Sequence, residues 1–266
     1  MKDAQQLLTS LLIKVKPACS PQDKSEKEIH DARVAIKRLK ARLRILSLKK
    51  KQPIEFERLY QLFTEINHSL AGRRDLDVAL STLKNLTDEH NEKSISQSIK
   101  WLQHAFKQQK IIIKENNVDL SSLYSEINQI TNSLAPVKLN KTSLNNIIQH
   151  SWERVCLAGE SALQSKQIKD LHSWRKRSKT LQYQAEVLND KTHNIDQHRK
   201  ILAKLGSTLG KLHDFLMLQI MITQVIDKSK PSPDMTGLTL LIEEKKHQLL
   251  ANCSRHHRSL CYSTKT

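Results

Sequence analysis

Apolar residues recur every three or four positions along nearly the whole chain, which is the spacing of one face of an α-helix. This pattern predicts helices over residues 3–16, 24–50, 54–71, 74–86, 92–116, 120–133, 143–165, 168–190, 195–208, 212–228 and 236–254. Prolines lie at several predicted ends, where the ring cannot continue the preceding helix. The pattern therefore predicts an all-α fold. No apolar run approaches the roughly 18 residues of a membrane-spanning helix, so we expect no membrane partner.

The composition excludes several classes of protein. The 266 residues include only 5 Gly and 6 Pro, too few for the turns of an all-β sandwich or barrel. Neither the P-loop pattern nor the dinucleotide-binding pattern GxGxxG occurs, so no glycine-rich phosphate loop is present. The 4 cysteines include no CxxC pair and are too few for a disulfide scaffold. We therefore expect a reducing, intracellular location in the cytoplasm.

The charge is strongly positive and unevenly distributed. Lys and Arg number 44 against 27 Asp and Glu, which gives a formal net charge of +17. Residues 24–51 hold eleven Lys and Arg, and residues 169–180 hold five more. Such a charge indicates a polyanionic partner, which is nucleic acid, anionic lipid or a phosphate polymer.

The basic segment 24–51 has two distinct helical faces. At 100° per residue, one stripe gathers His30, Arg33, Lys37, Lys40 and Arg44. Another stripe gathers Ala32, Ile36, Leu39, Leu43 and Leu46. The apolar stripe is expected to pack, while the cations follow one another about one turn, or ~5.4 Å, apart. A linear phosphate polymer, with its regularly spaced anionic oxygens, fits along such a row.

The cationic pattern occurs twice. His172, Arg175 and Lys179 repeat the spacing of the first stripe, although Gln182 and Glu186 replace its last two cations. A second shared segment follows each copy, at 70–75 and at 209–214. The duplication predicts two similar helical halves, 1–134 and 137–255, which join near Ala135–Lys141, and a flexible tail over 256–266.

These segments carry a family resemblance. EIHDARVAIKRLKARLRIL (28–46) and LAGRRDLDVAL (70–80) resemble the first half of a CHAD domain, a histidine-bearing α-helical domain. DLHSWRKRSKTLQY (170–183) and LGSTLGKLHDFLMLQ (205–219) resemble its second half. The resemblance implies a single domain over 1–266, made of two antiparallel four-helix bundles related by a pseudo-two-fold axis, with a basic groove or cavity between them. It also implies binding of inorganic polyphosphate, often at polyphosphate granules.

The same resemblance implies a set of ligand residues. Carried over by position, the polyphosphate-binding residues are His30, Arg33, Lys37, Arg38, Lys40 and Arg44 in the first half and His172, Arg175, Lys176 and Lys179 in the second. Arg73 and Arg74 are secondary candidates. Cations around His30 and His172 should lower the pKa of each imidazole, so that both are neutral donors in the free protein. The neighbouring Asp75 and Asp77 do not share a helix face, so we expect them to serve a helix start rather than a metal or catalytic site.

Two other functions compete with polyphosphate binding. Non-specific binding to a nucleic-acid backbone needs the same cations, but residues 24–51 contain no aromatic residue on which a base could stack. Histidine phosphotransfer at His30 is suggested by the basic residue three positions later. Against phosphotransfer, no ATP-binding segment is visible and the motif occurs twice. We therefore expect a binding protein without catalytic residues or cofactor.

The C-terminal segment concentrates potential metal ligands. Cys253, His256, His257 and Cys261 approach zinc-ligand spacing. A second pair of ligands elsewhere in the chain is not evident from the sequence. We therefore expect no metal site.

Overall fold

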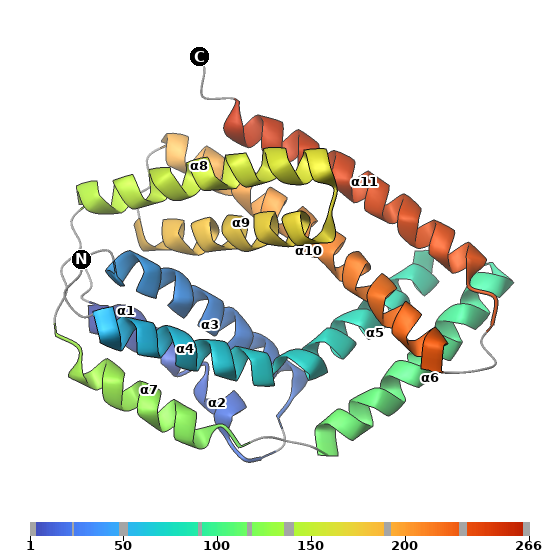
Figure 1. Cartoon of the computed structure of the whole chain (residues 1–266), viewed down its shortest axis with the longest axis horizontal. Helices are drawn as coiled ribbons and strands as arrows, with labels where there is room; N and C mark the ends of the chain where they lie inside the picture. Colours follow the sequence, from blue (N-terminus) through green and yellow to red (C-terminus); the bar gives the residue numbers. More distant parts are fainter. Residues whose placement is uncertain are drawn as a thin grey trace. The chain divides into compact units, whose positions relative to one another are not determined.

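The computed structural model describes residues 4–22, 24–47, 53–89, 92–115, 119–135, 141–188, 193–228 and 233–262. Their regular elements are all α-helices, in agreement with the predicted class (Figure 1). In chain order they are α1 (Ala4–Leu12), α2 (Lys16–Cys19), α3 (Glu26–Ser47), α4 (Pro53–Ser69), α5 (Ala71–Glu89), α6 (Lys93–Glu115), α7 (Ser121–Ser133), α8 (Lys141–Ser165), α9 (Ile168–Leu188), α10 (His193–Lys228) and α11 (Thr236–Cys261). Within these ranges, no helix has both the length and the apolar character needed to cross a membrane.

Three predicted boundaries differ from the structure. Residues 3–16 were expected to form one helix, but α1 ends at Leu12 and the short α2 follows, because Pro17 in the first turn of α2 blocks a continuous helix. The predicted interruption between 208 and 212 is absent, and α10 is a single helix of 36 residues. The end of α11 lies at Cys261, so residues 256–261 are helical rather than a flexible tail.

The continuity of α10 has a simple cause. Leu205, Leu209 and Leu212 are buried and three or four residues apart, so they form one uninterrupted apolar stripe. Gly210 lies between them and weakens a helix by only about 1 kcal/mol, which buried leucines can offset. A glycine inside a strong apolar pattern therefore did not end this helix.

The helices group into two compact units, each built from separate stretches of sequence. Unit 1 comprises residues 1–74, 116–155 and 179–195. In this unit α3 packs against α1, α2 and α4, while α7 packs against α1, α2 and α4 (Figure 1). The core of the unit includes the fully buried residues Ile36, Leu39, Leu59 and Phe63.

The start of α3 is fixed by a capping box. The backbone N–H of Ser25 donates to Glu28 Oε2 at 2.8 Å, and the backbone N–H of Glu28 donates to Ser25 Oγ at 3.2 Å. The two residues thereby satisfy orphan backbone donors of the first turn reciprocally. The apolar stripe of α3 faces the core of unit 1, so the cations of this helix lie on another side.

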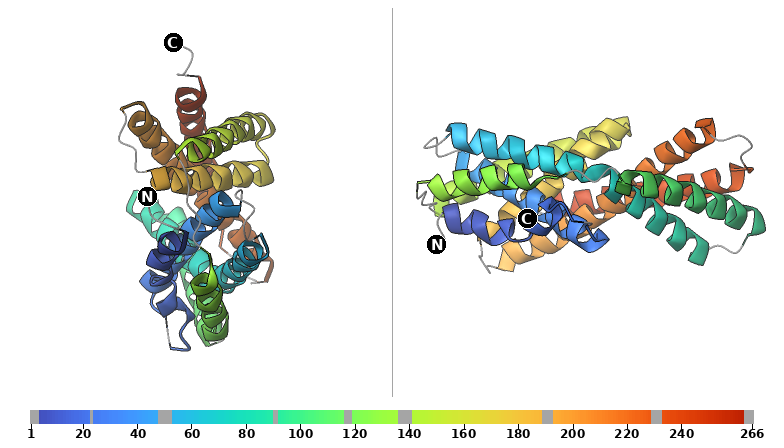
Figure 2. Two further views of the ribbon diagram at one scale, coloured as in Figure 1. Left: turned by 90° about the vertical axis from the view of Figure 1, so that its left-hand side faces the viewer. Right: turned by 90° about the horizontal axis from the view of Figure 1, so that it is seen from below.

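Unit 2 comprises residues 75–115, 156–178 and 196–266. One core of this unit lies among α5, α6, α10 and α11, whose adjacent ends Figure 2 shows from below. Its buried residues include Leu83, Phe106, Leu218 and Ile242. This core joins helices from both sides of the predicted seam. Residues 136–140 of that seam lie outside the described residues, and the two-fold relation between halves 1–134 and 137–255 stays a prediction.

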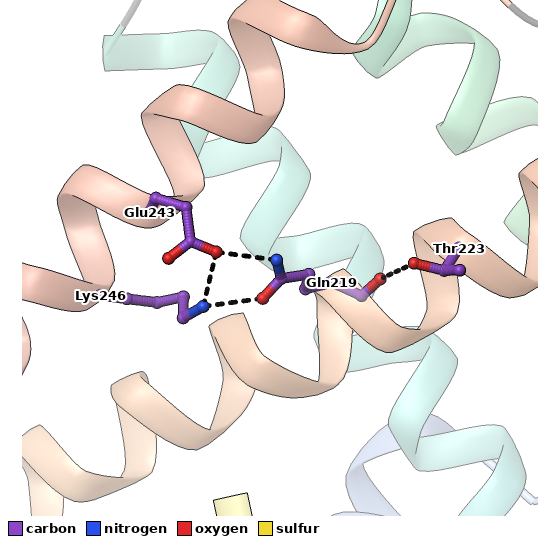
Figure 3. A network of polar contacts seen from close by, with 4 residues as sticks. All are labelled: Gln219, Thr223, Glu243 and Lys246. Atoms are coloured by element: carbon purple, nitrogen blue, oxygen red, sulfur yellow. Dashed lines mark hydrogen bonds and ion pairs between the residues drawn. The ribbon is translucent and has the colours of Figure 1, made fainter. Parts of the chain in front are cut away.

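A closed polar network joins α10 and α11 in unit 2 (Figure 3). Gln219 Nε2 donates to Glu243 Oε1 at 2.8 Å, and Lys246 Nζ donates to Gln219 Oε1 and to Glu243 Oε1, each at 2.7 Å. The bonds to Lys246 and Gln219 lower the pKa of Glu243. Lys246 is therefore paired with a carboxylate of the same chain, and its hydrogen bonds help to hold the two helices together.

Candidate polyanion-binding surface

The two faces of α3 have the burial that the sequence predicts. The apolar residues Ala32, Ile36, Leu39, Leu43 and Leu46 are each at most 2% exposed. On the other side, Arg33, Lys37 and Lys40 are half-buried, and His30 and Arg44 are exposed. We call His30, Arg33, Lys37, Lys40 and Arg44 the cationic face of α3. One side of the helix packs, and the other carries a row of cations in unit 1.

Two side chains of α4 hold Lys40 in place. Lys40 Nζ donates to Thr64 Oγ1 at 2.7 Å and lies 4.3 Å from the centre of the Tyr60 ring. Thr64 Oγ1 in turn donates to the Tyr60 carbonyl at 2.7 Å. Hydroxyl and ring are both uncharged. These contacts therefore orient the ammonium group without cancelling its charge.

Two arginines of the cationic face contact the same helix. Arg33 Nη1 donates to the Asn67 carbonyl at 3.1 Å, and Arg44 Nη2 donates to Tyr60 Oη at 2.8 Å. The lower-numbered cation meets the higher-numbered partner, so α3 and α4 are antiparallel. Since Tyr60, Thr64 and Asn67 are four and three residues apart, they share one face of α4.

Sequence reasoning missed this row of neutral partners. A weak signal was present, because Tyr60 and Thr64 are four residues apart, as are their partners Arg44 and Lys40, whereas Asn67 contacts Arg33 through its backbone carbonyl. However, a tyrosine and a threonine one turn apart on a helix surface are common in any protein. Only the antiparallel contact of α3 with α4 gives this spacing its meaning.

Arg38 lies in a different environment. It forms a two-bond ion pair with Glu186 of α9, with Nε–Oε2 at 3.0 Å and Nη2–Oε1 at 3.3 Å, and its guanidinium lies 5.4 Å from the centre of the Tyr183 ring. Burial lowers the pKa of the neighbouring Arg42, an effect that Glu186 opposes and Arg38 reinforces. Glu186, which replaces a cation in the second copy of the pattern, therefore neutralises one of the predicted ligands.

His30 has the lowered pKa that the sequence predicts. Partial burial is the largest cause, and Arg74, Lys37 and Arg33 lower the pKa further, while Asp31 opposes them. The imidazole is therefore mainly neutral near pH 7 and can donate one hydrogen bond. The same interaction places Arg74 within the electrostatic reach of the cationic face. The side chain of Arg73, the other secondary candidate, lies outside the described residues.

The second set of predicted ligands is divided between the units. His172, Arg175 and Lys176 belong to unit 2, whereas Lys179 belongs to unit 1 with α3. The rings of His172 and His213 lie 5.1 Å apart, and Lys179 Nζ donates to Gln182 Oε1 at 3.1 Å. On α9 the buried stripe includes Trp174, Ser178, Leu181 and Ala185. A groove between the two sets of cations stays a prediction.

The expectation for Asp77 is wrong. Asp77 is the seventh residue of α5 and is 6% exposed, too far along the helix to serve its start. Its Oδ1 forms an ion pair with Lys110 Nζ of α6 at 2.6 Å. The partner 33 residues later, which no spacing rule links to Asp77, explains the burial of this carboxylate.

Comparison with known proteins identifies the fold. A sequence profile described as the CHAD domain matches residues 14–223 of the chain. The structure is similar to the crystal structure of the CHAD domain from the plant Ricinus communis, with a TM-score of 0.68 at 14% sequence identity. That similarity covers 98% of this chain and 91% of the plant domain. None of the curated proteins compared matches the chain.

Proposed function

Since this chain belongs to the CHAD domain family, we propose that it binds inorganic polyphosphate through the cationic face of α3 and does not transform it. One observation carries the proposal. Tyr60, Thr64 and Asn67 hold cations of α3 by contacts to uncharged groups, and these contacts orient the cations without neutralising them. A polymer of phosphate groups provides one anionic oxygen after another for such a row.

The neutral imidazole of His30 complements the permanent cations. In the free protein it donates a hydrogen bond, and a bound polyanion favours its protonated form, which adds a charge where the ligand needs it. Arg74 extends the cationic surface at the same end. Arg38 contributes less, because Glu186 already shares its guanidinium.

Non-specific nucleic-acid binding gains support from one contact. Residues 24–51 lack an aromatic residue, but α4 brings the ring of Tyr60 beside Lys40 and Arg44. Such a ring is a platform on which a base can stack. Both cations already lie close to this ring, so a stacking base would have to displace them. The arrangement therefore favours a ligand that uses only phosphate groups.

A competition assay at fixed salt tests the proposal. Labelled long-chain polyphosphate is bound to the purified protein and challenged with single-stranded DNA, duplex DNA and RNA at equal phosphate concentration. We expect unlabelled polyphosphate to compete far better than any nucleic acid. Tighter binding of a nucleic acid would contradict the proposal and favour the alternative function.

The absence of catalysis is tested separately. Polyphosphate incubated with the protein, with and without a divalent metal ion, should keep its length distribution on a gel. Turnover that is lost on His30→Gln would show an enzyme instead. Labelled phosphate bound covalently to His30 would indicate phosphotransfer. Association with polyphosphate granules in the cytoplasm stays a prediction, testable by fluorescence microscopy of the tagged protein.

A further inference from the structure

Three potential metal ligands meet in unit 2, on helices other than α3. The side-chain ligand atoms of Cys156, His257 and Cys261 all lie within 4.8 Å of one another. His257 and Cys261 are four residues apart on α11, so both project from the same face of that helix. Cys156 comes from α8, more than a hundred residues earlier. It is the partner that the sequence alone did not reveal.

In the structure Cys156 and Cys261 are joined by a disulfide. The cysteine count did not predict this bond, since we expected a reducing location. The disulfide has a sequence separation of 105 residues and joins the end of α11 to α8. Disulfides persist in oxidising surroundings and are reduced by cellular dithiols, so the pair can exist as a disulfide or as two thiols.

Other contacts keep these two helices together when the disulfide is open. His257 is 2% exposed, and its Nε2 lies 3.0 Å from the Cys156 carbonyl. Tyr262 Oη donates to Glu160 Oε1 at 2.9 Å. The imidazole lies so close to Gly159 that a Cβ at this position would be 2.3 Å from His257 Cδ2. Reduction therefore yields two thiols that remain beside the imidazole.

The hydrogen bond of His257 suits a metal ligand. A carbonyl oxygen can only accept, so Nε2 carries the proton in this bond and Nδ1 keeps its lone pair in the neutral ring. Histidines that bind metals usually donate their second N–H to a carbonyl or carboxylate in this way. The Trp174 ring lies edge-on at 5.5 Å and helps to shield the imidazole from water.

We propose that the reduced protein binds one Zn²⁺ ion through Cys156, His257 and Cys261. A dithiol reductant transfers two electrons and two protons to the disulfide, which opens to two thiols while the reductant becomes a disulfide. Zn²⁺ then displaces both thiol protons and is bound by two thiolates and one imidazole nitrogen. Two sulfurs and one nitrogen are a ligand set that this borderline-soft ion prefers, and water takes the fourth position.

The site joins the end of α11 to α8 in either redox state, by a disulfide when oxidised and by a metal ion when reduced. Cys253, one turn before His257, is not part of the cluster. Burial raises the pKa of its thiol to about 12, so it stays protonated. The proposal does not depend on polyphosphate binding, because none of its residues lies on the cationic face of α3.

Zinc titration of the full chain in its two redox states is the primary test. One sample is reduced with a phosphine, which leaves no thiol reductant to compete for the metal, and the other keeps its disulfide. Zn²⁺ is titrated against a chromophoric chelator, and native mass spectrometry gives the stoichiometry. We expect one Zn²⁺ per chain in the reduced protein and at least ~10-fold weaker binding in the oxidised protein. Equal binding in both states, or none in the reduced state, would overturn the proposal without any mutation.

Variants identify the ligands. Cys156→Ser, Cys261→Ser and His257→Gln should each weaken Zn²⁺ binding at least ~10-fold, while Cys253→Ala and His256→Gln keep the wild-type affinity. Co²⁺ bound to the reduced wild type should show the intense thiolate-to-metal absorption, which Cys156→Ser and Cys261→Ser diminish. Full affinity in Cys156→Ser would exclude the site. Circular dichroism checks that each variant stays helical. If a variant unfolds, the zinc titration of the wild type in its two redox states still tests the proposal.

Discussion

Thr64 controls the position of a single cation, so it separates orientation from charge. Its hydroxyl accepts from Lys40 and donates to the Tyr60 carbonyl. Thr64→Val removes both bonds and keeps the shape and charge of the protein. We expect polyphosphate affinity to fall roughly two- to fivefold, the value of one hydrogen bond, with an unchanged salt slope. Fluorescence titration at several salt concentrations measures both quantities.

A matched threonine provides the control for that variant. Thr223 is also exposed and donates to the carbonyl four residues earlier, but it lies on α10 in unit 2 (Figure 3). Thr223→Val should leave affinity unchanged. If Thr64→Val binds as tightly as Thr223→Val, then the contact with Lys40 does not position the ligand.

His30 makes polyphosphate binding depend on pH. Its pKa in the free protein is below the usual value, mainly through burial and then through Arg74. A bound polyanion raises this pKa, so binding takes up a proton at pH values between the free and the bound pKa, and affinity rises as the pH falls through that interval. Calorimetry in two buffers of different ionisation enthalpy measures the uptake. His30→Gln should lower it by a fraction of one proton, and an equal uptake in both proteins would contradict this role.

At the scale of helices, two glycines differ in the space that a larger side chain would have. Gly210 lies inside α10, and a Cβ there would have no atom within 4 Å. Gly210→Ala should therefore raise the free energy of unfolding by about 0.5–1 kcal/mol. Gly159→Ala should lower it by roughly 1–3 kcal/mol, because the new Cβ would overlap His257 and press on Trp174. Urea unfolding measures both, and a destabilised Gly210→Ala would mean that α10 needs a break at this point.

Apolar periodicity along the chain predicts which face of a helix is buried. The stripe through Ile36, Leu39 and Leu43 fixes which side of α3 packs, and therefore where the cations lie. Periodicity also predicts the existence and order of most helices. It could not predict that α10 continues through Gly210, because the packing of buried leucines there outweighs the low helix propensity of glycine.

Contacts between distant segments were the part that the sequence could not supply. Asp77 pairs with Lys110, Arg38 with Glu186, and Cys156 with Cys261, and each pair joins different helices. Every one of these residues is chemically ordinary in its own segment. Their roles depend on which helices pack together, and one sequence without its structure does not contain that information in a local pattern.

At the scale of the whole molecule, a net charge of +17 attracts any polyanion, so charge alone does not identify a binding surface. Exposed lysines elsewhere allow a matched comparison. Lys84, Lys100 and Lys107 lie exposed on α5 and α6 in unit 2. Replacing these three lysines by Gln removes as many positive charges as replacing Arg33, Lys37 and Lys40 does. A difference between these two triple variants therefore reports position rather than net charge.

The salt dependence of binding counts the cations that contact the ligand. Each contact releases condensed counterion, by about 0.7–0.9 units of slope for nucleic acids, and we apply that range to polyphosphate. The variant with Arg33→Gln, Lys37→Gln and Lys40→Gln should flatten the slope by roughly two to three units, and the variant with Arg175→Gln and Lys179→Gln by roughly one to two. The control at Lys84, Lys100 and Lys107 should change the slope little.

Both α3 and α9 keep their buried stripes in these variants, so circular dichroism should show unchanged helix content. Equal slopes in the two triple variants would show that polyphosphate senses only the total charge, and loss of helix in the α3 variant would show that its cations stabilise the fold instead.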